Sequence, residues 1–492
     1  MSGVGMSAVL TNGQGLSAVD RRALAVLLPG FVGRNLPDWL ATRLRDGLAG
    51  VCLFATNIES RAQLRELTTA ILTANPFAII AIDEEGGDVT RLYSDQGSPY
   101  PGNALLGRID DLELTRSVAE TVGWELRAVG VGLDLAPDVD INSNPDNPVI
   151  GTRSFGADAH LVARHSAAWV SGLQSTGVAA SAKHFPGHGD TSQDSHLALP
   201  VVDLSLDELS ARELVPFAAV VEAGSQTVMT SHILLPQLDA ERPATLSSDI
   251  LHGLLRERLE FNGVIVTDAL DMKGASGDIG IPEAAVRAIA AGSDLLCIGT
   301  DNTDDELGQI AAAIGAAIED GRLDASRLED AAARVAILGR DIAAAAENIP
   351  IPEWALSDVP PAFGLGRAIA AFDIRPWARL PAIPLIVTLE TTANIAVGGS
   401  PWGLEAAGIR IMRLHEGDDL PESDSLVIVG KDNHRRQWVR DLIDLARKRH
   451  PSTMVIDMGW PSSDRRYADV ATFGASRYVG LALAAWLERA EG

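Results

Sequence analysis

The chain of 492 residues has only two cysteines, Cys52 and Cys297, and aromatic residues make up only 5% of it. Each cysteine lies within an apolar run, "GVCLFA" and "DLLCIG", so we expect both to be small buried hydrophobic residues. No apolar run reaches the length of a membrane span, and neither a GxGxxG nor a P-loop motif follows a strand-like run. These absences argue against a disulfide framework, a membrane-spanning protein and a nucleotide site.

Positive charge is also scarce, since 40 Lys and Arg face 66 Asp and Glu, which gives a formal net charge of −26. Such a chain repels phosphate backbones and anionic lipid heads, so we expect no nucleic-acid and no membrane partner. The segment "MSGVGMSAVLTNGQG" has no basic stretch followed by an apolar one, so a secretory signal is not expected and a cytoplasmic location is. The length and the 46% of hydrophobic residues predict two or three globular domains.

Eight short apolar runs alternate with helix-patterned segments such as "RAQLRELTTAILTA" between about residues 20 and 345. Nearly continuous apolar runs are typical of strands that are covered on both faces. Eight strand–helix units predict an α/β fold with a TIM-type (β/α)8 barrel, and a doubly wound open sheet is the alternative. The predicted strands are 23–30, 50–55, 77–83, 131–140, 177–184, 226–232, 263–270 and 294–299.

A second, smaller α/β domain is predicted after the barrel. We place the barrel domain at residues 1–346 and a linker at 347–366, where "NIPIPEWALSDVPPAFG" brings four prolines and loses the helical period. Residues 367–492 again alternate apolar runs with helices, which predicts a three-layer αβα sandwich.

Polar residues gather at the C-terminal ends of the apolar runs. In a barrel these ends form the mouth, where active sites lie. The residues concerned are Asp83, Asp134, Lys183, His184, Ser231, His232 and Asp268.

The stretch "KHFPGHGDTSQDSH" holds three of the ten histidines and leaves three interpretations open. A metal site would use His184, His188 and His196 with Asp190 or Asp194, but this spacing is not a known zinc pattern. A purely structural loop would explain His188 and Asp190. A catalytic loop would use Asp194 to orient His196 and raise its basicity, so that the imidazole acts as general acid and base.

The stretch "GVIVTDALDM" supplies the partner that such an acid needs. Asp271 fits a helix N-cap. Asp268 ends the apolar strand itself and should point into the barrel mouth. A carboxylate there can attack a carbon, which together with a proton donor fits two-step glycoside hydrolysis.

These two stretches and "AIDEEGGDVTRL" closely resemble family 3 glycoside hydrolases, specifically their β-N-acetylglucosaminidase branch, over about residues 20 to 345. The resemblance implies that Asp268 is the nucleophile and that His196 is the acid/base with Asp194 as its partner. In a retaining enzyme the nucleophile and the acid lie roughly 5–5.5 Å apart. The resemblance also implies that the sugar is held by Asp83, Arg91, Arg153, Lys183 and His184. No cofactor and no metal is expected.

Some of these residues have plainer explanations. Asp83 and Lys183 could form a salt bridge with each other, and Arg153 could simply fix its loop. The chain departs from the family at Glu84, where Gln or His is frequent, and at Asp88, where Arg is frequent. We expect these two carboxylates to change what the site accepts beyond the terminal sugar.

The expected function is that of a retaining, exo-acting β-N-acetylglucosaminidase on small glycosides. A β-glucosidase and a phosphorylase remain alternatives within the family, the latter because an imidazole does not repel a phosphate acceptor as a glutamate would. A non-catalytic sugar-binding protein and a metallohydrolase are the rivals from other classes. A monomer and a homodimer are both compatible with the sequence.

Overall fold

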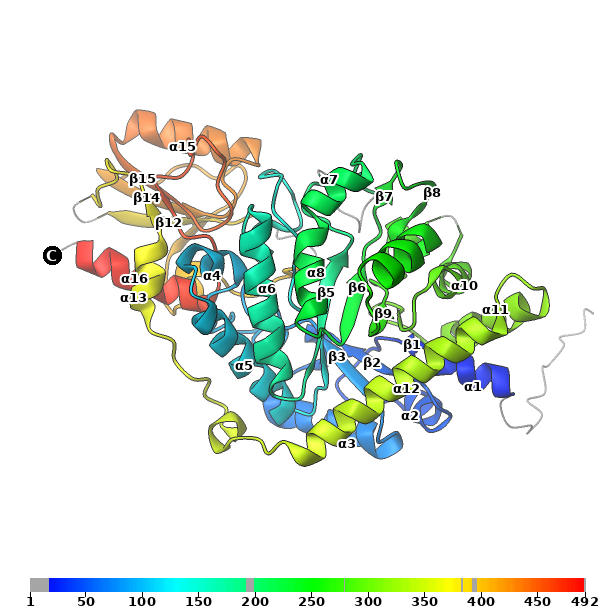
Figure 1. Cartoon of the computed structure of the whole chain (residues 1–492). Helices are drawn as coiled ribbons and strands as arrows, with labels where there is room; N and C mark the ends of the chain where they lie inside the picture. Colours follow the sequence, from blue (N-terminus) through cyan, green and yellow to red (C-terminus); the bar gives the residue numbers. More distant parts are fainter. Residues whose placement is uncertain (1–16, 192–198, 278, 382–383, 392–395, 491–492) are drawn as a thin grey trace, which may run out of the picture.

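The computed structural model of the protein describes residues 17–191, 199–277, 279–381, 384–391 and 396–490 (Figure 1). Each of the eight predicted strands overlaps a strand of the structure. They are β1 (Leu27–Leu28), β2 (Gly50–Leu53), β3 (Ile79–Ile82), β4 (Leu133–Asp134), β5 (Ala179–Phe185), β6 (Thr227–Thr230), β9 (Val264–Val266) and β10 (Leu296–Cys297).

The strands form a curled parallel sheet. Six of them pair in the order β2-β3-β4-β5-β6-β9, and β10 pairs with β1. A parallel bridge between Val266 and Leu295 joins β9 to the segment of β10. The amide of Cys52 donates to the carbonyl of Pro29 over 2.9 Å, which links β2 to the segment of β1. The α/β fold class is therefore confirmed, and the sheet is consistent with a TIM-type barrel.

The first predicted strand begins too early, because Ala23 and Leu24 belong to helix α1 (Ala18–Leu24). Ser17 and Asp20 form a capping box at the start of this helix, and the buried end of the helix runs directly into the buried strand. The apolar run "ALAVLLPG" therefore covers two elements, which hydropathy alone does not separate. A short hairpin of β7 (Leu234–Leu235) and β8 (Asp239–Pro243) was not predicted.

Helices surround this sheet (Figure 1). Helix α3 (Arg61–Ala74) matches the predicted segment, since Ser60 caps it and Leu64, Leu67 and Ile71 face the core. The other helices are α2 (Asp38–Arg45), α4 (Asn103–Ile109), α5 (Leu112–Ala128), α6 (Ala159–Gln174), α7 (Leu206–Ala211), α8 (Leu214–Glu222), η4 (Asp249–Arg258), α9 (Lys273–Ser276), α10 (Ile281–Ala291), α11 (Asp304–Glu319) and α12 (Ala325–Asn348).

The C-terminal part of the chain builds a second sheet in the order β11-β16-β15-β14-β12-β13, in which only β11 is antiparallel. Helix α15 covers one face, and α13, α14 and α16 cover the other, which gives the predicted three layers. The elements are α13 (Leu365–Ala371), β11 (Asp373–Ile374), β12 (Leu385–Leu389), α14 (Gly403–Ala406), β13 (Met412–Leu414), β14 (Ser425–Gly430), α15 (Gln437–Arg449), β15 (Ser452–Asp457), β16 (Val470–Ala471) and α16 (Arg477–Ala490).

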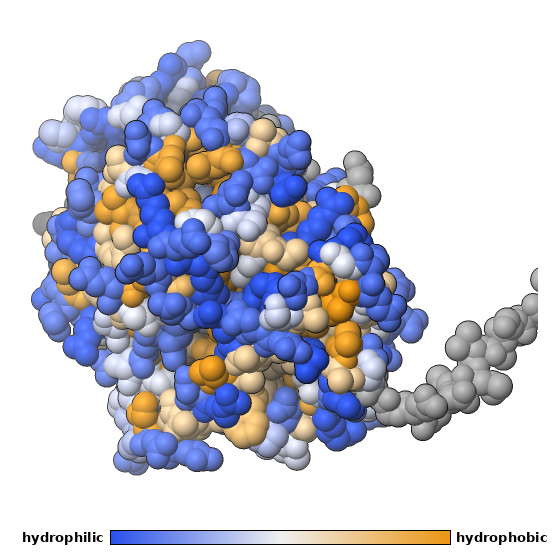
Figure 2. All heavy atoms as spheres, turned by 45° about the vertical axis from the view of Figure 1, so that its right-hand side comes forward, coloured by the Kyte–Doolittle hydropathy of each residue, from blue (hydrophilic) through white to orange (hydrophobic). Residues whose placement is uncertain are grey.

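Between α12 and α13 the chain passes along the outside of the molecule with one short helical turn, Glu353–Leu356 (Figure 1). Leu105 of α4 is buried in the core of the C-terminal part, so the two parts share apolar contacts. On the face drawn in Figure 2, hydrophilic side chains predominate and apolar ones form small separate groups. Within the described ranges, no helix combines the length and the apolar character of a bilayer span.

Candidate active site

A cavity of about 290 Å³ lies at the C-terminal ends of the barrel strands. Cys52 and Cys297 also face it, and both are buried with free thiols. The predicted site residues Asp194 and His196 lie outside the described residues. The predicted site residues that line the cavity are Asp83, Arg91, Arg153, Lys183, His184 and Asp268.

Lys183 lies between two carboxylates. Its Nζ is 2.6 Å from Oδ1 of Asp83 and 2.8 Å from Oε1 of Glu85. The salt bridge that the sequence left open as a plain explanation for Asp83 and Lys183 therefore exists. Since Lys183 is only 2% exposed, the bridge holds its ammonium group in a fixed place on the cavity wall.

Glu85 is the centre of this charge network, and the sequence analysis missed it. Arg153 donates from Nε to Oε2 of Glu85 over 2.9 Å and from Nη2 to Oε1 over 2.7 Å, a bidentate pair. Burial opposes ionisation of Glu85, but Arg153 and Lys183 outweigh it and hold the pKa of Glu85 well below its ordinary value. Arg153 thus fixes its loop, as the plain explanation had it, and also faces the cavity.

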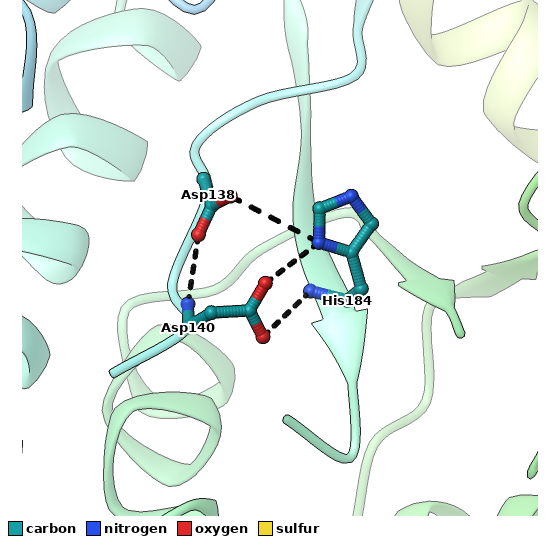
Figure 3. Close-up of side chains that lie close together, drawn as sticks. All are labelled: Asp138, Asp140 and His184. Atoms are coloured by element: carbon teal, nitrogen blue, oxygen red, sulfur yellow. Dashed lines mark hydrogen bonds and ion pairs between the residues drawn. The ribbon is translucent and has the colours of Figure 1, made fainter. Parts of the chain in front are cut away.

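His184 is oriented by two buried aspartates that follow β4 (Figure 3). Its Nδ1 lies 2.7 Å from Oδ2 of Asp140 and 3.9 Å from Oδ2 of Asp138. The contact with Asp140 favours a proton on Nδ1 and turns Nε2 toward the guanidinium of Arg153, 3.3 Å away. Both aspartates lie beyond the last strand residue of β4, where the sequence analysis assigned no site residue.

The same three side chains could in principle hold a metal ion, since their ligand atoms lie within 4.8 Å of one another. The guanidinium of Arg153, however, is 3.6 Å from Asp138 and 3.3 Å from His184, and its positive charge repels a divalent cation. We therefore expect dialysis against EDTA to leave unchanged the rate of the glycoside hydrolysis that the sequence resemblance implies. A loss of rate that added Zn²⁺ restores would contradict this expectation.

Asp268 lies two residues beyond the end of β9, on the cavity wall. The amide of Ala269 donates to Oδ1 of Asp268 over 2.8 Å. Asp271 also lines the cavity, and it is not a helix N-cap, because Met272 precedes α9 and caps it without a side-chain bond. The predicted N-cap role of Asp271 was wrong, since the chain continues through a turn before the helix begins.

Glu84 and Asp88, the two departures from the family pattern, do not line the cavity. Glu84 is buried, and its Oε2 accepts the amides of Arg91 over 2.8 Å and of Leu92 over 2.9 Å. It therefore fixes the backbone on which Arg91 stands. Asp88 bonds outward to Thr152 and Ala475. Neither carboxylate lines the cavity, so each can act on a sugar only through the residues that it holds. The expectation that they change what the site accepts beyond the terminal sugar stays a prediction.

Burial raises the pKa of Glu84 from 4.5 to about 7. In the unfolded chain this group loses its proton near pH 4.5, so between 4.5 and 7 the folded state holds more protons and its stability falls as the pH rises. We expect the free energy of unfolding of the wild type, relative to Glu84→Gln, to decrease across this window and to level off above it. Urea unfolding at about pH 5 and about pH 8 measures the difference. A difference that does not change with pH contradicts the prediction.

His188 and Asp190 also belong to the described part of the histidine loop, and His188 lines the cavity. Burial lowers the pKa of His188 to about 4, so its ring is neutral at pH 7, and its Nδ1 contacts the hydroxyl of Thr191 over 2.9 Å. Asp190 forms an ion pair with Arg212. These contacts fit the interpretation that His188 and Asp190 hold the loop in shape.

Comparison with known proteins decides the family. The model of the glycosyl hydrolase family 3 N-terminal domain matches residues 35–338, which is more than half of the chain. The chain belongs to glycosyl hydrolase family 3. The resemblance seen in the sequence is thereby confirmed, and the matched residues include seven of the eight strands of the parallel sheet, β2 to β10 without the β7–β8 hairpin.

Two relatives and one solved structure illustrate the similarity. β-Hexosaminidase A of Pseudoalteromonas piscicida is 36% identical over 365 residues, which cover 69% of this chain but only 60% of that protein. A β-hexosaminidase of Stenotrophomonas maltophilia is 37% identical over 293 residues, 57% of this chain and 85% of that protein. The structure of a family 3 β-N-acetylglucosaminidase from Paenibacillus sp. matches with a TM-score of 0.84 and 29% identity over 96% of this chain and 97% of that one. This last match includes the C-terminal part.

Proposed function

We propose that the protein is a retaining exo-β-N-acetylglucosaminidase that removes terminal N-acetyl-β-D-glucosamine from small glycosides. The observation that carries the proposal is the cavity that brings Asp268 together with Asp83, Arg153 and Lys183 at the mouth of the barrel. Relatives named β-hexosaminidase and β-N-acetylglucosaminidase support the choice of sugar.

The charges of the cavity suit a pyranose. Asp83 accepts hydroxyl protons, while Lys183 and Arg153 donate, and the network around Glu85 fixes both cations before the sugar arrives. Preformed donors of this kind do not need to reorganise on binding.

In the proposed reaction the carboxylate of Asp268 attacks the anomeric carbon and forms a covalent glycosyl-enzyme. His196, oriented by Asp194, protonates the leaving oxygen. In the second step the same imidazole takes a proton from water, which attacks the anomeric carbon and releases the sugar with its original configuration. The roles of Asp194 and His196 come from the family resemblance alone.

An activity panel tests the proposal. We expect release of nitrophenol from its β-N-acetylglucosaminide to be much faster than from its β-glucoside, and proton NMR to show the β-anomer as the first product. A faster reaction on the glucoside would favour the β-glucosidase alternative. A sugar 1-phosphate formed in the presence of phosphate would favour the phosphorylase alternative.

A further inference from the structure

The segment between β3 and α4, residues 83–102, lies between the barrel and the C-terminal part of the chain. Its first residues, Asp83 and Glu85, face the sugar cavity. Its later residues meet the C-terminal part, since Ser476 donates from Oγ to the carbonyl of Tyr100 over 2.6 Å and the amide of Tyr478 donates to the carbonyl of Ser98 over 3.2 Å. The segment therefore connects the wall of the cavity directly to the C-terminal part.

The side chain of Asp88, in this segment, bonds to both sides at once. Its Oδ2 accepts the hydroxyl of Thr152 over 2.9 Å, and its Oδ1 accepts the amide of Ala475 over 2.9 Å. Thr152 belongs to the short helical turn η2 (Gly151–Arg153), so it stands directly before Arg153. One carboxylate thus holds the loop of a cavity cation and the turn that leads into α16 of the C-terminal part.

Arg91 is the second point at which the C-terminal part reaches the cavity. Its Nη2 donates to the carbonyl of Ala396 over 3.1 Å and lies 3.8 Å from Oδ2 of Asp83. Ala396 itself lines the cavity. The direction of the Arg91 side chain is therefore set by a backbone carbonyl from the C-terminal part.

We infer that Asp88 is a positioning residue that docks the C-terminal part on the barrel, so that Ala396 closes one wall of the sugar cavity and Arg91 and Arg153 keep their places. Asp88 acts through these two arginines and does not contact the sugar. The inference rests on the proposed function. It adds a role for the C-terminal part, which is to hold the side chains of Arg91 and Arg153 in place for binding the sugar.

The test compares Asp88→Ala with Asp88→Asn. Alanine removes both acceptors, whereas the amide of asparagine can accept from Ala475 with its oxygen and donate to Thr152 with its nitrogen. We expect Asp88→Ala to raise KM for nitrophenyl β-N-acetylglucosaminide about tenfold, the effect of losing one to two hydrogen bonds, with a smaller change in kcat. Asp88→Asn should restore KM to within about threefold of the wild type.

Amide hydrogen exchange gives a second readout that does not depend on activity. Exchange in peptides that cover residues 84–92 and 470–480 should accelerate in Asp88→Ala and not in Asp88→Asn. Asp95→Asn is the matched control, because Asp95 lies in the same segment, is exposed, and its side chain contacts its neighbour Gln96. It should change neither KM nor exchange.

Three results would overturn the inference. One is a KM of Asp88→Ala within about twofold of the wild type. Another is an equal rise of KM in Asp88→Asn, which would assign the effect to charge rather than to the two bonds. The third is unchanged exchange in Asp88→Ala. If the wild type does not hydrolyse the glycoside at all, the proposed function fails, and the exchange experiment alone decides whether Asp88 docks the two parts.

Discussion

Asp268→Asn is expected to lower kcat for the aryl N-acetylglucosaminide by about 10⁴-fold or more, because the amide has the same shape but cannot form the bond to the anomeric carbon. In the wild type the amide of Ala269 donates to Oδ1 of Asp268 over 2.8 Å. The side-chain oxygen of asparagine can accept the same bond, so the fold should persist. Steady-state rates together with a thermal unfolding curve measure both effects.

A second variant distinguishes a nucleophile from a residue that merely supports the site. In Asp268→Gly, added azide should attack in place of the missing carboxylate and give a glycosyl azide of inverted configuration. Asp301→Asn serves as control, since Asp301 is an exposed acid in the loop after β10, and its rate should match the wild type. An Asp268→Asn rate within about tenfold of the wild type would refute the assignment.

The largest effect on stability is expected at Glu85. This carboxylate is 3% exposed and binds both Arg153 and Lys183, so Glu85→Gln leaves two buried cations with too little negative charge beside them. Breaking a buried pair from one side costs about 3–5 kcal/mol. We expect the free energy of unfolding at pH 7 to fall by about this amount, as measured in urea.

Glu59→Gln is the matched control for this experiment. Glu59 pairs with Arg34 over 2.8 Å, but both side chains are more than half exposed, so water screens the pair. Its loss should cost less than about 1 kcal/mol. If Glu85→Gln is no more destabilising than Glu59→Gln, the network around Glu85 does not hold the cavity together.

The strands could be predicted because each is a short apolar run with turn residues on both sides, and all eight barrel strands are found. The errors come from features that hydropathy does not encode. The helix that ends at Leu24 is set by the cap at Ser17. Strand β11, Asp373 and Ile374, lies in "FDIRP", where no apolar run marks a strand. The domain boundaries, the cytoplasmic location and the oligomeric state stay predictions.

The site residues that could be predicted lie within short continuous sequence motifs. Asp83, Lys183 and Asp268 lie within two residues of the C-terminal ends of β3, β5 and β9, and parallel strands bring these ends together. Glu85 was missed although it stands two residues from Asp83, a spacing that can place both on one side of an extended chain. Asp88 and Ala475 are 387 residues apart, and no local pattern indicates such a contact.

The two bonds by which the C-terminal part meets Asp88 and Arg91 use the amide of Ala475 and the carbonyl of Ala396. Every residue carries a carbonyl, and every residue but proline an amide, so these bonds put no chemical demand on the side chains at 396 and 475. Replacing the side chain at 396 or 475 therefore keeps these bonds within the limits of packing, whereas replacing the side chain of Asp88 or Arg91 removes them. Covariation between aligned sequences would accordingly overlook this contact.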